Sequence, residues 1–229
     1  MRRNIFALLR TFLFAALLPV VSLGLVSCEP ESEDDNTTPG TSSYKAVDLG
    51  LSVKWASCNV GAKSPEDYGD YFTWGETTAK SSYTKDNSLT ADLSISAMRS
   101  RGIIDFIGNL TPAYDAATAN WGGSWRMPTS AEIRELLNDC TWRWTTQNGV
   151  YGCKVTGPNG NSIFLPATGY HGAKWTYDDG DEGDYPSATM ESKSTGVYGL
   201  YFKQQSGKLN NGLDYWNRYV GFTVRPVTE

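Results

Sequence analysis

An acidic segment in the last quarter of the chain is the first candidate for ligand chemistry. Its five carboxylates are Asp178, Asp179, Asp181, Glu182 and Asp184. Carboxylate oxygens are ligands that Ca²⁺ prefers, but the spacing here is not that of an EF-hand loop. A solvated acidic loop is therefore the favoured interpretation, and calcium is the one cofactor that this segment suggests.

A single histidine limits the catalytic alternatives. His171 occurs in Gly169-Tyr170-His171-Gly172, and no nucleophile elbow lies nearby in the sequence. A Ser or Cys nucleophile needs a base positioned beside it, and a lone histidine without a placed partner is typical of a surface loop. We therefore expect no enzyme. A hydrolase that uses His171 or the acidic segment ranks lowest among the alternatives.

Aromatic side chains in the C-terminal third are candidates for stacking on sugar rings. Those in segments without a clear strand pattern are Trp175, Tyr177, Tyr185, Tyr215 and Trp216. Binding residues are often carried by loops. The alternative is that these rings pack long loops against the domain, and the sequence favours neither. The tryptophans in or near strand-like and motif segments are expected in the core, and they are Trp55, Trp74, Trp121, Trp125, Trp142 and Trp144.

Short helices must hold these candidates in place. Thr129 and Glu132 have capping-box spacing, and Ile133, Leu136 and Leu137 then fall on one helical face. A shorter helix is expected over 115–119, with Asp115 as its cap. Strand-like pieces at 47–49 and 53–56 flank Gly50, and we expect them to form a hairpin. Further strand-like pieces occur at 71–74, 163–165, 198–203 and 219–225.

The clearest hairpin follows the main helix. Asn148-Gly149 is a favoured two-residue turn, so we expect Gln147 to pair with Val150 and Trp144 to face Cys153. The apolar face of this hairpin collects Trp142, Trp144, Tyr151, Cys153 and Val155, as in a half-buried antiparallel pair. The pattern as a whole predicts an α+β fold, with short helices packed on irregular antiparallel sheet.

The N-terminus has the layout of a secretory signal peptide. Two arginines are followed by an apolar stretch that ends in Leu25-Val26-Ser27-Cys28. This ending resembles a bacterial lipobox, so residues 1–27 are expected to be removed and Cys28 to carry the lipid. The alternative of an uncleaved anchor helix would place Arg10 inside the apolar span, which is costly. Residues 28–43 are acidic and then rich in Thr, Ser, Pro and Gly, so they predict a disordered tether.

Three cysteines follow Cys28, and the expected export places them in an oxidising compartment. A Cys140–Cys153 bridge is disfavoured because Cys153 faces Trp144, and four residues of strand span roughly 13 Å. The better pairing is Cys58–Cys140. The alternative of free buried thiols is nearly as strong.

Four motifs, in order, resemble the Fibrobacter succinogenes major paralogous domain, which is common in secreted Bacteroidetes lipoproteins. They are Val47–Ala62, Asp115–Thr129, Asn138–Trp142 and Gly221–Val227. The Trp-Arg-Met-Pro-Thr-x-x-Glu piece and the Gly-Phe-x-x-Arg ending also resemble the formylglycine-generating enzyme family, whose members have a C-type-lectin-like fold. The resemblance therefore implies that fold for residues 44–229.

The resemblance does not imply the enzyme's activity. Formylglycine-generating enzymes use cysteines in the C-terminal part of the domain, and this chain has none after Cys153. The calcium-dependent sugar signatures of C-type lectins are also absent, since Trp216-Asn217-Arg218 lacks the acid. The segment Tyr185–Thr189 departs from the Tyr-Trp-Ser-Ser-Thr of the paralogous domain, because the Trp is missing.

Charge and anchoring together define the expected function. From Tyr44 onward, the 20 basic and 25 acidic residues of the chain fall to 17 and 20, a net charge of −3. This balance gives no electrostatic reason to bind nucleic acid or an anionic membrane. We expect a non-catalytic binding module for glycan or protein, anchored by lipid to the outer membrane. The acidic run after Cys28 resembles a Bacteroidetes surface-export signal, so we expect exposure at the cell surface. The alternative is a structural or assembly component of the envelope or of fimbriae.

Overall fold

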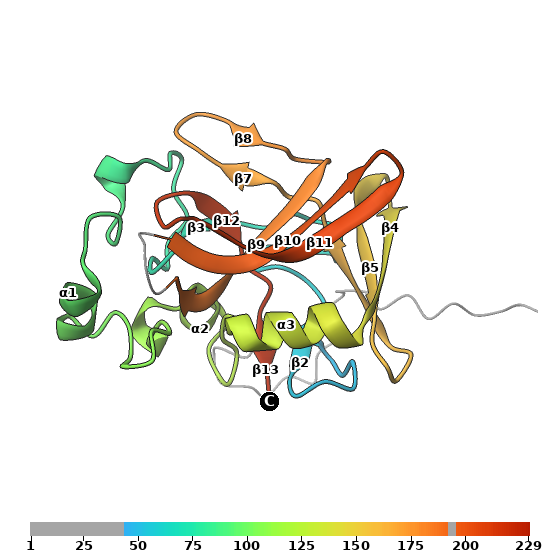
Figure 1. Ribbon diagram of the computed structural model, residues 1–229, viewed down its shortest axis with the longest axis horizontal. Coiled ribbons are helices and arrows are strands. Elements are labelled where there is room, and N and C mark those ends of the chain that lie inside the picture. The colour runs from blue at the N-terminus through green and yellow to red at the C-terminus, as the bar shows by residue number, and fades with distance from the viewer. Residues whose placement is uncertain (1–43, 192–195) are drawn as a thin grey trace, which may run out of the picture.

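The computed structural model describes residues 44–191 and 196–229. Cys28, the expected signal peptide and the expected tether lie outside these residues. The described part of the chain forms antiparallel sheets with a few short helices, which confirms the α+β class (Figure 1). None of the helices in the described ranges is long and apolar enough to cross a membrane.

The first two small sheets bring distant parts of the sequence together. β1 (Ala46–Val47) and β2 (Lys54–Ala56) form the hairpin predicted around Gly50, and β13 (Val227–Thr228) pairs with the other edge of β2. The second sheet has the order β3–β12–β7–β8, with bounds Tyr71–Thr73, Gly221–Thr223, Tyr170–His171 and Thr176–Tyr177. β12 therefore lies between a segment near the start of the domain and one about two thirds of the way along it.

The hairpin of β4 (Thr141–Gln147) and β5 (Val150–Thr156) has the predicted register, with Trp144 opposite Cys153 and Gln147 opposite Val150. Asn148 and Gly149 have φ angles of 47° and 85°, as the favoured two-residue hairpin turn requires. β6 (Ser162–Pro166) completes this sheet. Tyr151 is exposed, so the predicted apolar face of this hairpin is only partly buried.

The longest strands form the last sheet, in the order β11–β10–β9. β9 spans Glu182–Met190, β10 spans Gly196–Gln205 and β11 spans Lys208–Asn217. Ser206 and Gly207, with φ angles of 50° and 76°, make the turn between β10 and β11. The sequence predicts loops where β9 and β11 lie, and this prediction is wrong.

The helices have the predicted caps. α3 (Ser130–Asp139) begins after Thr129, whose side chain accepts from the Glu132 N–H, while the Glu132 side chain accepts from the Thr129 N–H. α2 (Ala116–Trp121) is capped by Asp115. The remaining helical segments are α1 (Ile95–Ser100) and two 3₁₀ turns, η1 (Lys85–Asn87) and η2 (Pro112–Tyr114). α3 packs beneath β9, β10 and β11 (Figure 1).

Two hydrophobic clusters form the core. The first surrounds Trp74, Met98 and Trp121, and the second joins α3 to Trp55, Val155 and Phe202. Arg225 is almost fully buried as well. Its guanidinium donates to Asn59 Oδ1 and to the carbonyls of Ala56 and Phe164, at 2.8 to 3.0 Å. Burial lowers the pKa of Arg225 to about 10. The arginine of the Gly-Phe-x-x-Arg ending thus holds strands together.

Candidate functional site

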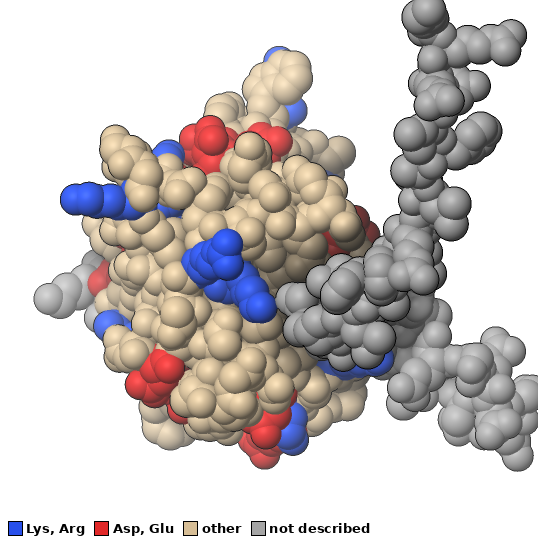
Figure 2. All heavy atoms as spheres, turned by 90° about the vertical axis from the view of Figure 1, so that its right-hand side faces the viewer, with Lys and Arg blue, Asp and Glu red and all other residues tan. Residues whose placement is uncertain are grey.

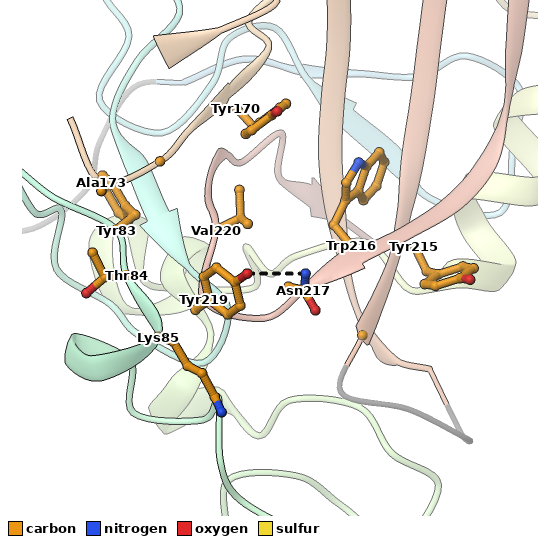
Figure 3. Close-up of a pocket in the computed structure, with 12 residues that line it drawn as sticks. Tyr83, Thr84, Lys85, Tyr170, Ala173, Tyr215, Trp216, Asn217, Tyr219 and Val220 are labelled. Carbon is orange, nitrogen blue, oxygen red and sulfur yellow. Dashed lines mark hydrogen bonds between the residues drawn. The ribbon is translucent and has the colours of Figure 1, made fainter. Parts of the chain in front are cut away.

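A cleft of about 740 Å³ lies among the β7 end of the second sheet, the end of β11 and the segment around η1 (Figure 3). This volume is in the range of small-ligand sites, which are mostly apolar with a few polar groups. We call it the aromatic cleft, because four tyrosines and a tryptophan contribute to its lining. Its residues are Tyr83, Thr84, Lys85, Tyr170, Gly172, Ala173, Gly196, Tyr215, Trp216, Asn217, Tyr219 and Val220.

Trp216 and Tyr170 form two aromatic walls that are supported from behind. The Trp216 ring packs 5.3 Å from Phe222, centroid to centroid. It also lies over Gly199, where an added Cβ would approach the indole to 2.5 Å. Tyr170 stacks on Tyr177 at 5.3 Å and contacts the same Phe222 at 6.4 Å. Rings fixed in this way lose little conformational entropy when a ligand binds.

Tyr83 forms a third wall. Its hydroxyl donates to the Tyr71 carbonyl and accepts from the Lys80 N–H. The ring covers Gly221, where a Cβ would come within 2.6 Å of it, so only glycine fits. Burial raises the pKa of Tyr83, and its hydroxyl stays protonated at neutral pH. This wall therefore offers the cleft a fixed, uncharged ring.

A small polar set completes the lining. Asn217 Nδ2 lies 3.4 Å from the Tyr219 hydroxyl, and Figure 3 shows this pair below the space between Tyr170 and Trp216. Thr84 adds a hydroxyl at the rim. Lys85 Nζ is bound to Asp92 Oδ1 at 2.7 Å. An arrangement of ring faces with a few hydroxyl and amide groups can stack on a ligand and hydrogen-bond to it.

The five aromatic residues that the sequence suggests for sugar stacking lie in different places in the structure. Trp216 and Tyr215 line the cleft, but Figure 3 shows them on opposite sides of the β11 ribbon, as alternation along a strand requires. Tyr177 supports Tyr170 from behind. Trp175, 68% exposed, lies before β8 and does not line the cleft. Tyr185 was predicted wrongly: it is buried in β9, where its hydroxyl donates to the Pro166 carbonyl.

The acidic segment is not one solvated loop, which corrects the favoured interpretation of its sequence. Among the described residues, no group of three or more His, Cys, Asp or Glu side chains is placed to hold a metal ion. The reason is that the segment is divided between a turn and a strand. Asp178, Asp179 and Asp181 are exposed, whereas Glu182 and Asp184 belong to β9. Glu182 forms an ion pair with Lys203 at 3.1 Å, and Asp184 is fully buried.

His171 is not in a surface loop, which corrects that expectation. It lies half-buried in β7, with its ring 5.7 Å from that of Tyr71 and 4.9 Å from that of Tyr83. Its Nδ1 lies 2.7 Å from the Gly172 carbonyl oxygen. These contacts give His171 a packing role behind the Tyr83 wall.

The predicted Cys58–Cys140 disulfide is absent, because Cys140 is a free thiol and so is Cys153. The physical reason is that Cys58 and Cys140 lie in different parts of the core. Cys58 lies between Ala56 and Val60, which belong to the first hydrophobic cluster, whereas Cys140 and Cys153 pack in the second. Burial raises the pKa of Cys140 to about 11 and that of Cys153 to about 12, so both remain protonated thiols at neutral pH.

Most residues of the cleft are not predicted from the sequence. Tyr83, Tyr170 and Tyr219 come from three separate segments, and no local pattern connects them. One signal was available: Ser206-Gly207 is a two-residue turn dipeptide, and it would have predicted a strand that carries Trp216.

Surface charge offers no competing site on the visible face of Figure 2. Outside the grey atoms, basic and acidic groups occur there in small, separate patches. Comparisons of this chain with family models, curated proteins and solved structures found no match.

Proposed function

We propose that this chain is a non-catalytic, lipid-anchored protein of the bacterial outer membrane, exposed at the cell surface, whose domain binds a glycan in the aromatic cleft. The observation that carries the proposal is the pair of fixed walls formed by Trp216 and Tyr170, with Asn217 and Tyr219 beside them. One face of a pyranose ring is rich in C–H groups and stacks on such rings, while its hydroxyls need a few polar partners.

The C-type-lectin-like fold belongs to this proposal and rests on the motifs named above. Several of these motif residues have structural roles. Arg126 forms a two-pronged ion pair with Glu132, and the Met127 N–H donates to Asp115 Oδ2 at 2.8 Å. These contacts join α2, α3 and the segment between them.

Substitution of Trp216 tests the proposal. The full-length chain, purified in detergent, is applied to an array of neutral and acidic glycans, and affinity for the best ligand is then measured by calorimetry. Trp216→Ala should weaken binding by about tenfold or more, because a buried aromatic contact contributes roughly 1.5 kcal/mol or more. Trp175→Ala is the matched control, since this exposed tryptophan is not among the cleft residues.

Two results would count against glycan binding. One is that no glycan binds while a specific protein partner is captured, and the other is that both tryptophan variants bind as well as the wild type. Circular dichroism of each variant shows whether the fold is retained, so that a loss of binding can be assigned to the cleft.

A second candidate, an assembly role, is favoured by one observation. β11 is a ten-residue strand at the edge of its sheet in the described structure, and edge strands offer unpaired backbone groups to another chain. The strand is polar, with Lys208, Asn210 and Asp214 along it, which opposes such pairing. Sedimentation of the full-length chain in matched detergent as a strict monomer would exclude assembly through β11.

A further inference from the structure

In the described structure, the lining of the aromatic cleft holds one charged residue, and its charge is paired. Among the lining residues in the described ranges, Lys85 is the one with a charged side chain. Its ammonium is held by Asp92 at 2.7 Å, and both side chains are largely exposed. Figure 3 shows Lys85 extending away from Val220 and Tyr170. The positive charge is therefore directed out of the cleft.

Acidic groups lie near Tyr170, outside the lining of the cleft. Burial, followed by the nearby charge of Asp178, raises the pKa of Tyr170. Glu182 is balanced by Lys203, and Asp184 is buried without a cation. Asp178 is exposed and has no ion pair in the described structure. An anionic ligand that stacked on Tyr170 would approach the charge of Asp178 without a compensating cation.

We propose that the aromatic cleft selects neutral sugar chains over acidic ones, and that Asp92 sets this selectivity by holding Lys85 away from the ligand. The inference rests on the proposed glycan-binding function. Carboxylate and sulfate groups are bound well where a cation forms charge-assisted hydrogen bonds with them. Lys85 has a flexible stem that could supply this cation if Asp92 did not restrain it. A neutral chain needs only ring faces and hydroxyl partners.

Removal of the Asp92 charge is the decisive experiment. The full-length chain in detergent is tested against hydroxyethyl cellulose, xyloglucan and galactomannan as neutral probes, and against polygalacturonate, alginate and heparin as acidic probes. The wild type should bind at least one neutral probe, with little change in affinity as salt is raised. Asp92→Asn should gain at least about threefold in affinity for an acidic probe, and salt should remove this gain because it screens exposed charges.

Three variants make the result specific. Asp86→Asn removes a neighbouring acid in η1 that is not the ion-pair partner of Lys85, so it should change acidic binding much less. Lys85→Met combined with Asp92→Asn should abolish the gain, since the lysine that lines the cleft is then removed. Trp216→Ala should weaken neutral and acidic binding alike.

Each outcome decides one of the two proposals. Wild-type preference for acidic probes would overturn the selectivity and leave glycan binding intact. The same holds if Asp92→Asn binds neutral probes normally but gains nothing on acidic ones. A wild type that binds none of the probes, nor any glycan of the array, would remove the proposed function and this inference with it.

Discussion

Asp184 shows how one side chain can make the stability of this fold depend on pH. The residue has no exposed surface, and neither of its carboxylate oxygens has a hydrogen-bond donor in the described structure. Burial and then the adjacent Glu182 raise its pKa from 3.8 to about 8. The other charged or titratable groups around it are Asp178, Tyr170, Tyr201, Lys203 and Asp214. The folded protein therefore keeps Asp184 protonated at neutral pH, whereas the unfolded chain releases the proton.

The sign of the effect follows from this difference. Because the folded state binds the extra proton, stability decreases as the pH rises from about 4 to about 8 and is constant with respect to this group above that range. Asp184→Asn removes the titration while it conserves the shape. The melting temperature of the variant should match that of the wild type near pH 4 and exceed it increasingly up to pH 8.

Thermal unfolding monitored by circular dichroism at several pH values measures this difference. Asp181→Asn is the matched control, because Asp181 is exposed in the turn before β9. A gap between wild type and Asp184→Asn that does not change with pH would show that Asp184 is not protonated in the folded state.

The N-terminus of α3 shows how a single element is fixed by a local sequence pattern. Thr129 and Glu132 cap the helix reciprocally. The Glu132 carboxylate also accepts hydrogen bonds from Nη1 and Nη2 of Arg126. Burial opposes ionisation of Glu132, but the hydrogen bonds from Arg126 and Thr129 outweigh it, and its pKa is lowered. The cap matters for the cleft only indirectly, since α3 packs beneath the sheet that carries Trp216.

Loss of this cap should destabilise the domain without changing the ligand site. Thr129→Ala is expected to lower the free energy of unfolding by about 1 kcal/mol, because the Glu132 N–H loses its side-chain acceptor. Denaturant titration measures the change, with Ser130→Ala at the first helical position as the control. Glycan affinity below the unfolding transition should stay at the wild-type value. A loss of affinity would mean that α3 shapes the cleft directly.

At the scale of the whole molecule, both ends of the described chain are bound to the rest of the domain. β13 pairs with β2, and Tyr44 stacks on Trp121 with ring centroids 3.8 Å apart. The start of the described chain is thus fixed against α2. The anchor proposed for Cys28 lies outside the described residues and rests on the lipobox pattern. Several acyl chains on one residue would hold the protein stably, since each buried CH₂ contributes about 0.8 kcal/mol.

The lipid anchor is tested at the mature N-terminus. Cleavage is expected between Ser27 and Cys28, with a lipidated Cys28 as the first residue, and mass spectrometry of the native N-terminal peptide reads this directly. Cys28→Ala should leave unprocessed precursor without lipid. An unmodified wild-type peptide that runs through Cys28 would show that the lipoprotein assignment is wrong.

Local patterns in the sequence determined the elements whose partners are near in the chain. The register of β4 and β5, the caps of α2 and α3 and the hairpin around Gly50 were all predicted, because turn residues and capping spacing act over a few positions. β11 could not be recognised from the sequence, because it is polar and lacks the alternation of apolar and polar residues that marks a half-buried strand.

Only the tertiary structure decided the cleft and the burial of charged groups. Tyr83, Tyr170 and Trp216 are far apart in sequence, and they meet because β12 lies beside both β3 and β7 while Phe222 on β12 supports two of the rings. Asp184 is likewise buried in β9 although the segment before it is acidic and exposed. Such contacts depend on which strands become neighbours, and that choice is made by burial over the whole core and not by the residues next to each strand.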